Sequence, residues 1–405
     1  MNAPLASFES AIDARHDAGR SVVLRYRRAL RFADGELEDE RLRELFACTS
    51  IAEGLRLFHL LRYRDVDLHV LDETSAMHTG TLKSIDGCVT IGGCLAEGLG
   101  RIVFESGGNT GGALAAYGTR AGIETFCFVP AENLSLLDSR TFGDGRAHLI
   151  AVDDPGLVRE AAERFAARHD VARVPRANWR ISASRFLGCF LLEALVGGAE
   201  FDWLVQTISA GFGPIGIYDV LAQHADRLPR VPRFLGVQQA ANCTMFRAWK
   251  AGSGDIATAP VRSTRSLLSR VMYDSRPQSY GTFARLAGLL ERSGGRLTTL
   301  DRDEFDRVLD AHPEGSRLLD GLAAHGLEIT IRDQEIVDPT GLMALVAALV
   351  EIDAGAIAPG SRVLCCLTSG AGRPDGRAVP EARVQDLAHL DRQLRAGWFP
   401  EARHE

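Results

Sequence analysis

Lysine is scarce in this chain, and one of its two lysines stands in a segment suited to chemistry. Of the 46 basic residues, two are lysines, Lys83 and Lys250, and the others are arginines. The guanidinium of arginine stays protonated near neutral pH and cannot form a Schiff base, whereas an amine can. A coding bias toward arginine could also leave two lysines by chance. The neighbours of Lys83, which read HTGTLKSIDG over residues 78–87, favour a task for its amine.

Loops that follow predicted strands supply the second chemical signal. Three of them, residues 106–112, 209–216 and 369–373, are rich in glycine or hydroxyl residues and precede predicted helices. Ligands of open α/β sheets bind beyond the carboxyl ends of the strands, where such loops lie. We therefore expect a ligand to be held by these three loops.

The loop 209–216 has the composition of a phosphate cradle. A glycine-rich turn lets backbone N–H groups approach an anion, and the N-terminus of the following helix favours negative charge. Ordinary tight turns between a strand and a helix share this pattern, so the loop alone leaves both interpretations open. Because Pro214 has no N–H, the donors would be the amides of Ala210, Gly211, Phe212 and Gly213.

The loop 106–112 offers groups for a carboxylate and for a phenolate oxygen. Ser106 and Thr110 carry hydroxyls beside exposed amides, and the amide of Asn109 can donate to a phenolate. The alternative is a polar helix N-cap, which serine and asparagine commonly provide.

Composition and absent motifs exclude several classes of protein. The chain has 405 residues, a net charge of −7 and a pI of about 5.9, which argues against binding nucleic acid or an anionic membrane. The motif GxxxxGK[ST] does not occur, so a P-loop site is disfavoured. Residues 211–216, which read GFGPIG, have the spacing GxGxxG, but this pattern is a weak signal on its own. The eight cysteines form no CxxC pair; we expect buried free thiols in a reducing compartment and no metal site. Residues 1–20 lack the apolar core of a signal peptide, and the apolar run 342–350 is too short to span a bilayer. We expect a soluble, cytoplasmic protein.

Strands and helices alternate along most of the chain, which predicts an α/β fold. This pattern is typical of twisted, mostly parallel sheets with helices on both faces. The segment before Lys83, here called the lead-in, does not show this alternation. Its residues 42–61 have apolar residues at helical spacing, and residues 62–71 are predicted to form one strand. The main elements are predicted as helices over about 83–99, 113–121, 155–168 and 182–196, and strands over 101–105, 124–129, 148–152, 202–208, 234–238 and 362–367.

We expect this fold to have two lobes. Residues 1–85 and 199–405 would form the larger, cofactor-binding lobe. Residues 86–198 would form the smaller lobe, which carries the loop around Asn109.

Five segments, in this order, carry a resemblance to a known family. Thr81–Ser84 is similar to a Ser-Phe-Lys-Asp/Ser motif, and Ser106–Gly111 is similar to Ser-Ser-Gly-Asn-Thr. Residues 191–216 match a helix, a strand and a phosphate loop, Asp338–Gly341 resembles a Glu/Asp-Pro segment, and Leu367–Gly370 resembles a strand end that contacts a pyridine nitrogen. Over roughly residues 75–375 the chain resembles the fold type II enzymes that depend on pyridoxal phosphate (PLP). This family includes threonine synthase, serine/threonine dehydratases, cysteine synthase and the tryptophan synthase β-subunit.

The resemblance implies which residues hold the cofactor. Lys83 would attach PLP as a Schiff base and then act as the base at the substrate Cα. Asn109 would donate to the 3′ oxygen of the cofactor, and Ser369, with Thr368 as second choice, would face its pyridine nitrogen. The cofactor phosphate would be held by the loop residues Ser209, Ala210, Gly211, Phe212 and Gly213.

The same resemblance implies a site for the amino-acid substrate. Ser106 and Thr110 would bind its carboxylate. Arg270 and Arg276 could bind a substrate phosphate or sulfonate, although arginines are frequent throughout the chain. Asp86 is expected to stabilise the first turn of its helix rather than to take part in the chemistry.

The implied activity is that of a PLP-dependent synthase or lyase of amino-acid metabolism. The long segment before the lysine, the run Tyr117–Gly122 and the Asp-Pro segment favour the threonine synthase branch. The reaction would be β- or β,γ-replacement on an O-activated amino acid, with phosphate as the favoured activating group. The alternatives are β-replacement of the cysteate or cysteine synthase type on an O-activated serine, elimination by a serine/threonine dehydratase, and an inactive PLP-binding relative. The family's habit predicts a homodimer.

Overall fold

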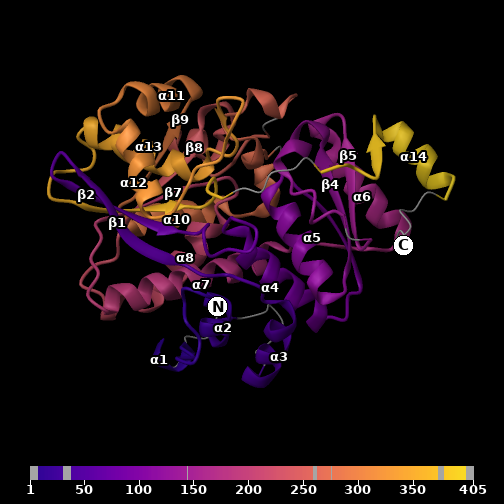
Figure 1. Cartoon of the computed structure of the whole chain (residues 1–405), viewed down its shortest axis with the longest axis horizontal. Coiled ribbons are helices and arrows are strands. Elements are labelled where there is room, and N and C mark those ends of the chain that lie inside the picture. Colours follow the sequence, from indigo (N-terminus) through magenta and orange to yellow (C-terminus); the bar gives the residue numbers. More distant parts are fainter. Residues whose placement is uncertain are drawn as a thin grey trace.

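Two β-sheets organise the part of the chain that the computed structural model describes, residues 8–30, 38–143, 145–258, 262–274, 276–372 and 378–397. They lie side by side, the larger on the left and the smaller on the right (Figure 1). In sheet order, the larger consists of β1 (Arg56–Tyr63), β2 (Val66–Asp72), β12 (Arg362–Leu367), β7 (Trp203–Thr207), β8 (Arg233–Gln239) and β9 (Arg296–Leu300). The smaller consists of β13 (Ala382–Val384), β5 (Ala147–Val152), β4 (Glu124–Pro130), β3 (Arg101–Glu105) and β6 (Ala172–Arg173).

Nearly every strand pair in these two sheets is parallel. The smaller sheet is parallel throughout, and in the larger sheet the pair β1–β2 alone is antiparallel among the described strands. Parallel sheets are buried on both faces, so their strands are expected to be continuous apolar runs. The strand β12, of sequence RVLCCL, has five buried residues out of six. The predicted α/β fold with mostly parallel sheets is confirmed.

Helices cover both sheets. The helix α13 (Thr340–Asp353) packs on β12 and β7, and α6 (Val158–His169) packs on β3 and β4. On the other side, α4 (Lys83–Ala96) lies against α5 (Asn109–Ala121) and α7 (Ala177–Val196), and α7 crosses α8 (Phe212–Gln223). The remaining helices discussed below are α2 (Val22–Tyr26), α3 (Asp39–Thr49), α9 (Thr244–Lys250) and α14 (Leu387–Arg395).

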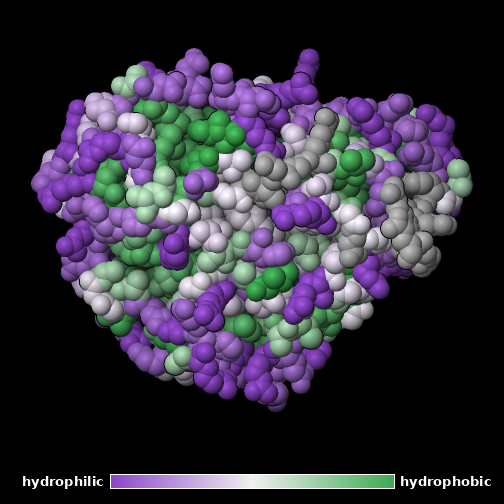
Figure 2. Space-filling model, viewed as in Figure 1, coloured by the Kyte–Doolittle hydropathy of each residue, from purple (hydrophilic) through white to green (hydrophobic). Residues whose placement is uncertain are grey.

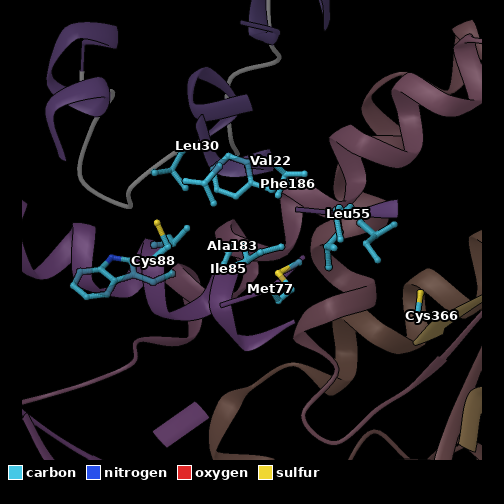
Figure 3. Packing of buried hydrophobic residues seen from close by; sticks show 14 of the residues in the cluster. Val22, Leu30, Leu55, Met77, Ile85, Cys88, Ala183, Phe186 and Cys366 are labelled. Carbon is cyan, nitrogen blue, oxygen red and sulfur yellow. The ribbon is translucent and has the colours of Figure 1, made fainter. Parts of the chain in front are cut away.

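The main hydrophobic core joins the N-terminal segment to the helices between the sheets. Val22 of α2 and Leu30 lie close to Ile85 of α4 and Phe186 of α7, and all four are buried (Figure 3). The N-terminal segment thus packs against α4 and α7, which are distant from it in the sequence, and holds both helices in place. It thereby fixes the position of Lys83, the first residue of α4.

In the lead-in before α4, two predictions from the sequence are wrong. The helical spacing of residues 42–61 does not give one helix, because α3 ends at Thr49 and β1 begins at Arg56. Residues 62–71 do not form one strand, because they hold the end of β1, a turn and most of β2. The turn residues Arg64 and Asp65 have φ of 44° and 63°, a left-handed geometry that reverses a hairpin.

The division into two lobes stays a proposal, with 86–198 as the smaller. The strands β3, β4, β5 and β6 of the smaller sheet lie inside this range. The chain also returns to this sheet near its end, because β13 pairs with β5 and α14 packs on α6.

The surface in the view of Figure 1 is mixed in polarity. Apolar residues appear there in separate patches among hydrophilic ones (Figure 2). None of the helices in the described ranges has the length and apolar character that a bilayer crossing requires. Of the eight cysteines, seven are buried and Cys48 is exposed, and all eight are free thiols, as expected.

Candidate active site

A cavity of about 410 Å³ opens where strands of both sheets end. The loops after β3, β7 and β12 contribute to its lining, together with the start of α4. These are the three loops that the sequence singled out, although residue 373 of the third lies outside the described residues. The cavity is therefore at the carboxyl ends of parallel strands, where α/β proteins bind ligands.

The residues predicted to hold the cofactor and the substrate carboxylate all line this one cavity. Their roles toward cofactor and substrate remain predictions, because a shared cavity does not assign a role. The residues are Lys83, Ser106, Asn109, Thr110, Ser209, Ala210, Gly211, Phe212, Gly213 and Ser369, and Thr368 lies with them.

The amine of Lys83 lies in a largely enclosed position. Its side chain is 23% exposed, and its Nζ lies 3.1 Å from Oδ2 of Asp86, one helical turn further along α4. Burial lowers the pKa of Lys83 and the charge of Arg180 lowers it further, whereas Asp86 and Glu73 act in the opposite direction. A lowered pKa suits an amine that must become neutral to react. Lys250 is exposed at the end of α9, 5.6 Å from the ring of Phe246.

The loop after β7 forms an anion cradle at the start of α8. Gly211 has a φ of 76°, which turns the chain sharply into the helix at Phe212. The first amides of a helix have no acceptor within the helix and face a ligand at its N-terminus. Pro214 lies in this first turn, where the missing N–H removes no helix hydrogen bond. The backbone of residues 209–213 is therefore suited to a phosphate group.

The loop after β3 is braced by hydrogen bonds. The Oγ of Ser106 accepts from the amides of Gly108 and Gly111 at 3.0 and 2.8 Å. Asn109 donates from Nδ2 to Oδ2 of Asp338 at 3.0 Å, and this bond joins the loop to the segment before α13. Ser106 thus supports the loop, and its hydroxyl proton can still point toward a ligand. Neither Ser106 nor Asn109 is the N-cap of α5, which is Gly108.

Two hydroxyl residues at the end of β12 also line the cavity. Within the described part of the chain, the Oγ1 of Thr368 and the Oγ of Ser369 are buried and have no hydrogen-bond partner. A Cβ at Gly341 would lie 2.3 Å from the carbonyl oxygen of Ser369, so glycine is needed where α13 meets this strand end. Buried hydroxyls without a partner are rare in proteins and indicate that a polar ligand belongs there.

Glu73 follows β2 behind the cavity and is fully buried. Neither of its carboxyl oxygens has a hydrogen-bond partner among the described residues. Burial raises the pKa of Glu73 from its ordinary value of 4.5 to about 8, despite weaker effects of the Cys366 thiol and of Lys83 that lower it. A carboxyl in this position is neutral near pH 7.

We expect Glu73 to make the protein less stable as the pH rises. The folded state keeps this proton between pH 4.5 and about 8, whereas the unfolded state loses it, so the free energy of unfolding falls across that window. The slope from this one group approaches about 1.4 kcal/mol per pH unit. Glu73→Gln removes it, so the stability of the variant relative to the natural protein should increase with pH. Denaturant unfolding over a pH series measures this, with the same change at exposed Glu328 as control. A stability difference that is independent of pH would contradict the assignment.

Sequence reasoning missed the charged residues around the cavity mouth. Arg159, Arg173 and Arg180 line the cavity, whereas the arginines proposed for a substrate anion, Arg270 and Arg276, are not among its lining residues. Arg159, Arg173 and Arg180 lie far from Lys83 in the sequence, and arginine is frequent throughout the chain. No sequence pattern therefore marked these three as site residues. Arg159 and Arg173 lie 3.7 and 3.4 Å from Glu105.

Asp274 also lines the cavity and was not predicted. Burial raises its pKa to about 6. Among the described residues, four basic side chains and two carboxyls line the cavity. Two further carboxylates pair with these basic groups: Glu163 with Arg159 and Arg173, and Asp86 with Lys83 and Arg180.

The residues present fit pyridoxal phosphate. Lys83 offers an amine, the start of α8 an anion cradle, and Thr368 and Ser369 hydroxyls without a partner in the described chain. A sheet pair of this kind with such a site defines the fold type II class of PLP-dependent enzymes. The chain belongs to the family of pyridoxal-phosphate dependent enzymes, whose model matches residues 55–369. The cofactor and class expected from the sequence are confirmed.

Relatives and solved structures agree with this assignment. The chain is 24% identical to a cysteate synthase of Methanosphaerula palustris over 348 residues, which cover 79% of this chain and 73% of the relative. It is 25% identical to a threonine synthase of Mycobacterium leprae over 317 residues, with 76% and 77% covered. The fold is similar to that of threonine deaminase isoform 2 from Solanum lycopersicum, with a TM-score of 0.56, 14% identity, and 90% and 95% of the chains covered. The chain is thus a PLP-dependent enzyme similar to synthases and lyases.

Proposed function

We propose that this enzyme catalyses β- or β,γ-replacement on an amino acid activated by an O-linked anionic group, with phosphate as the favoured leaving group. The observation that carries the proposal is that three arginines, Arg159, Arg173 and Arg180, line the cavity that holds Lys83. Similarity to a threonine synthase and to a cysteate synthase supports the same type of reaction.

The chain's own residues have distinct tasks in this proposal. The amides of residues 209–213 bind the cofactor phosphate, Asn109 donates to its 3′ oxygen, and Ser369 faces its pyridine nitrogen. Bound PLP supplies an electron sink that stabilises negative charge at the substrate Cα. Lys83 holds the cofactor covalently and, once released, takes the proton from Cα at its Nζ.

Other residues bind the substrate and its leaving group. Ser106 and Thr110 hold the substrate carboxylate. Arg159 and Arg173 attract the anionic leaving group, and both also pair with Glu105 and Glu163, which hold them in place. Replacement requires that the cavity keep water away from Cα after the leaving group departs, because hydrolysis there would give a keto acid.

A substrate titration tests this function. Purified holoenzyme is mixed with O-phosphoserine, O-phosphohomoserine, O-acetylserine, serine and threonine, each with and without sulfite, while its visible absorbance, phosphate release and keto acid formation are recorded. We expect a phosphorylated amino acid to shift the absorbance and release phosphate. Keto acid from serine or threonine, with no response to the phosphorylated compounds, would instead identify a dehydratase.

Removal of one basic side chain at the mouth should affect phosphorylated substrates selectively. A hydrogen bond to a charged group contributes about 1.5–3 kcal/mol, so Arg173→Gln should raise KM for the phosphorylated substrate by roughly tenfold or more. The KM for O-acetylserine should change little, because its leaving group is neutral while bound. Arg276→Gln is the matched control. An equal change in KM for both substrates in Arg173→Gln would show that Arg173 does not bind the leaving group.

A further inference from the structure

Asp86 makes a buried ion pair with the candidate catalytic lysine. The two residues are three apart on α4, a spacing that places side chains on the same face of a helix. The Oδ2 of Asp86 lies 3.1 Å from Nζ of Lys83, and the Asp86 side chain is 6% exposed. An acidic residue in the first turn of a helix can simply stabilise its N-terminus. Here the same carboxylate oxygen also contacts the amine that the reaction needs.

Arg180 of α7 holds Asp86 from the other side. Its Nη2 and Nε lie 3.1 and 3.4 Å from Oδ2 of Asp86. Nη2 also donates to Oγ1 of Thr110 at 3.3 Å, and the guanidinium carbon lies 4.5 Å from the ring centre of Phe212. Arg180 thereby connects the lysine helix, the loop around Asn109 and the phosphate loop.

Electrostatics explains why this carboxylate stays ionised. Burial alone would raise the pKa of Asp86, but Lys83 and Arg180 outweigh burial and hold the pKa below its ordinary value. Three titratable groups act on Lys83: Asp86 on its own helix, Arg180 on α7, and Glu73 after β2. Since burial keeps Glu73 protonated near pH 7, Asp86 is the carboxylate of the three that is charged.

We propose that Asp86, held by Arg180, is a positioning residue that receives the ammonium of Lys83 whenever this amine is not attached to the cofactor. The proton stays on Nζ of Lys83 and Asp86 stays ionised, so the pair stores the Cα proton without passing it on. The carboxylate also returns the amine to one fixed place beside the substrate. The inference rests on the proposed role of Lys83 and names a residue for which only a helix-stabilising role was expected.

The two-lysine composition allows a direct test on the full chain before PLP is added. Competitive acetylation over a pH series, read by peptide mass spectrometry, reports the reactivity of Lys83, with Lys250 as reference within the same molecule. A neighbouring opposite charge raises the pKa of an amine. Asp86→Asn should therefore shift the midpoint for Lys83 downward by about one pH unit or more. Arg180→Gln should shift it upward, because a like charge is removed, and Lys250 should not change in either variant.

The two variants are expected to shift the midpoint for Lys83 in opposite directions, so either variant alone tests the proposal if the other folds poorly. An unchanged or raised midpoint in Asp86→Asn, or an unchanged midpoint in Arg180→Gln, would overturn the proposal. In the holoenzyme, Asp86→Asn should lower kcat about tenfold or more with little change in KM, and should raise the isotope effect of a Cα deuterium. A purely structural role would not raise that isotope effect. Acetylation uses no substrate, so it can succeed even if the proposed reaction is wrong.

Discussion

Replacing Lys83 by alanine is expected to lower kcat by at least about 10³-fold and to remove the visible absorbance of covalently held PLP. The side chain lines the same cavity as the residues predicted to hold the cofactor, and its pKa is lowered by burial. Removing the amine deletes both the attachment point and the base at Cα. Turnover and an absorbance spectrum of the purified variant measure the two effects separately.

Lys250→Ala is the matched control for Lys83→Ala. This lysine is exposed at the end of α9 and does not line the cavity. Its removal should leave both the spectrum and turnover unchanged. If Lys83→Ala retained the absorbance band, or if Lys250→Ala lost it, the assignment of the cofactor lysine would be wrong.

A methyl group at Gly216 is expected to destabilise the enzyme and to weaken its hold on PLP. A Cβ at this position of α8 would lie 2.5 Å from the carbonyl oxygen of Ile181 and 2.5 Å from Cβ of Ser184, both on α7. Backbone atoms cannot move aside as a flexible side chain can, so α8 must shift. Overpacking of this kind costs about 1–3 kcal/mol, and a shifted α8 also displaces the phosphate cradle at its start.

Gly112→Ala provides the comparison for Gly216→Ala. Gly112 lies inside α5, and a Cβ there would meet no described atom within 4 Å. Alanine at this position should therefore stabilise the helix by up to about 1 kcal/mol. Denaturant unfolding and PLP titration of both variants test the difference. A Gly216→Ala enzyme as stable as the natural one would show that α7 and α8 can separate without cost.

The sequence located the loops that line the cavity better than it located the elements before the lysine helix. A strand, a glycine-rich loop and a helix N-terminus are set by nearby residues, so the loop 209–216 could be read directly. The hairpin of β1 and β2 could not, because its turn uses Arg64 and Asp65 rather than the usual Asn-Gly pair. Without a recognisable turn, the end of β1 and the start of β2 looked like a single strand in the sequence.

Contacts between distant segments explain the other omissions. Arg180 reaches Asp86 from α7, 94 residues later in the chain, and only the packing of α4 on α7 brings them together. The strand β13 joins the smaller sheet after the chain has completed the larger one. Neither contact is marked by a pattern in the neighbouring sequence, because each forms only when whole helices and strands pack together.

Borohydride reduction of the purified holoenzyme, followed by peptide mass mapping, tests the central claim most directly. Reduction fixes PLP irreversibly to the amine that holds it, and the chain offers two lysines. The account predicts the phosphopyridoxyl label on the peptide that contains Lys83. A label on Lys250, or bound PLP that leaves both lysines unlabelled, would contradict it.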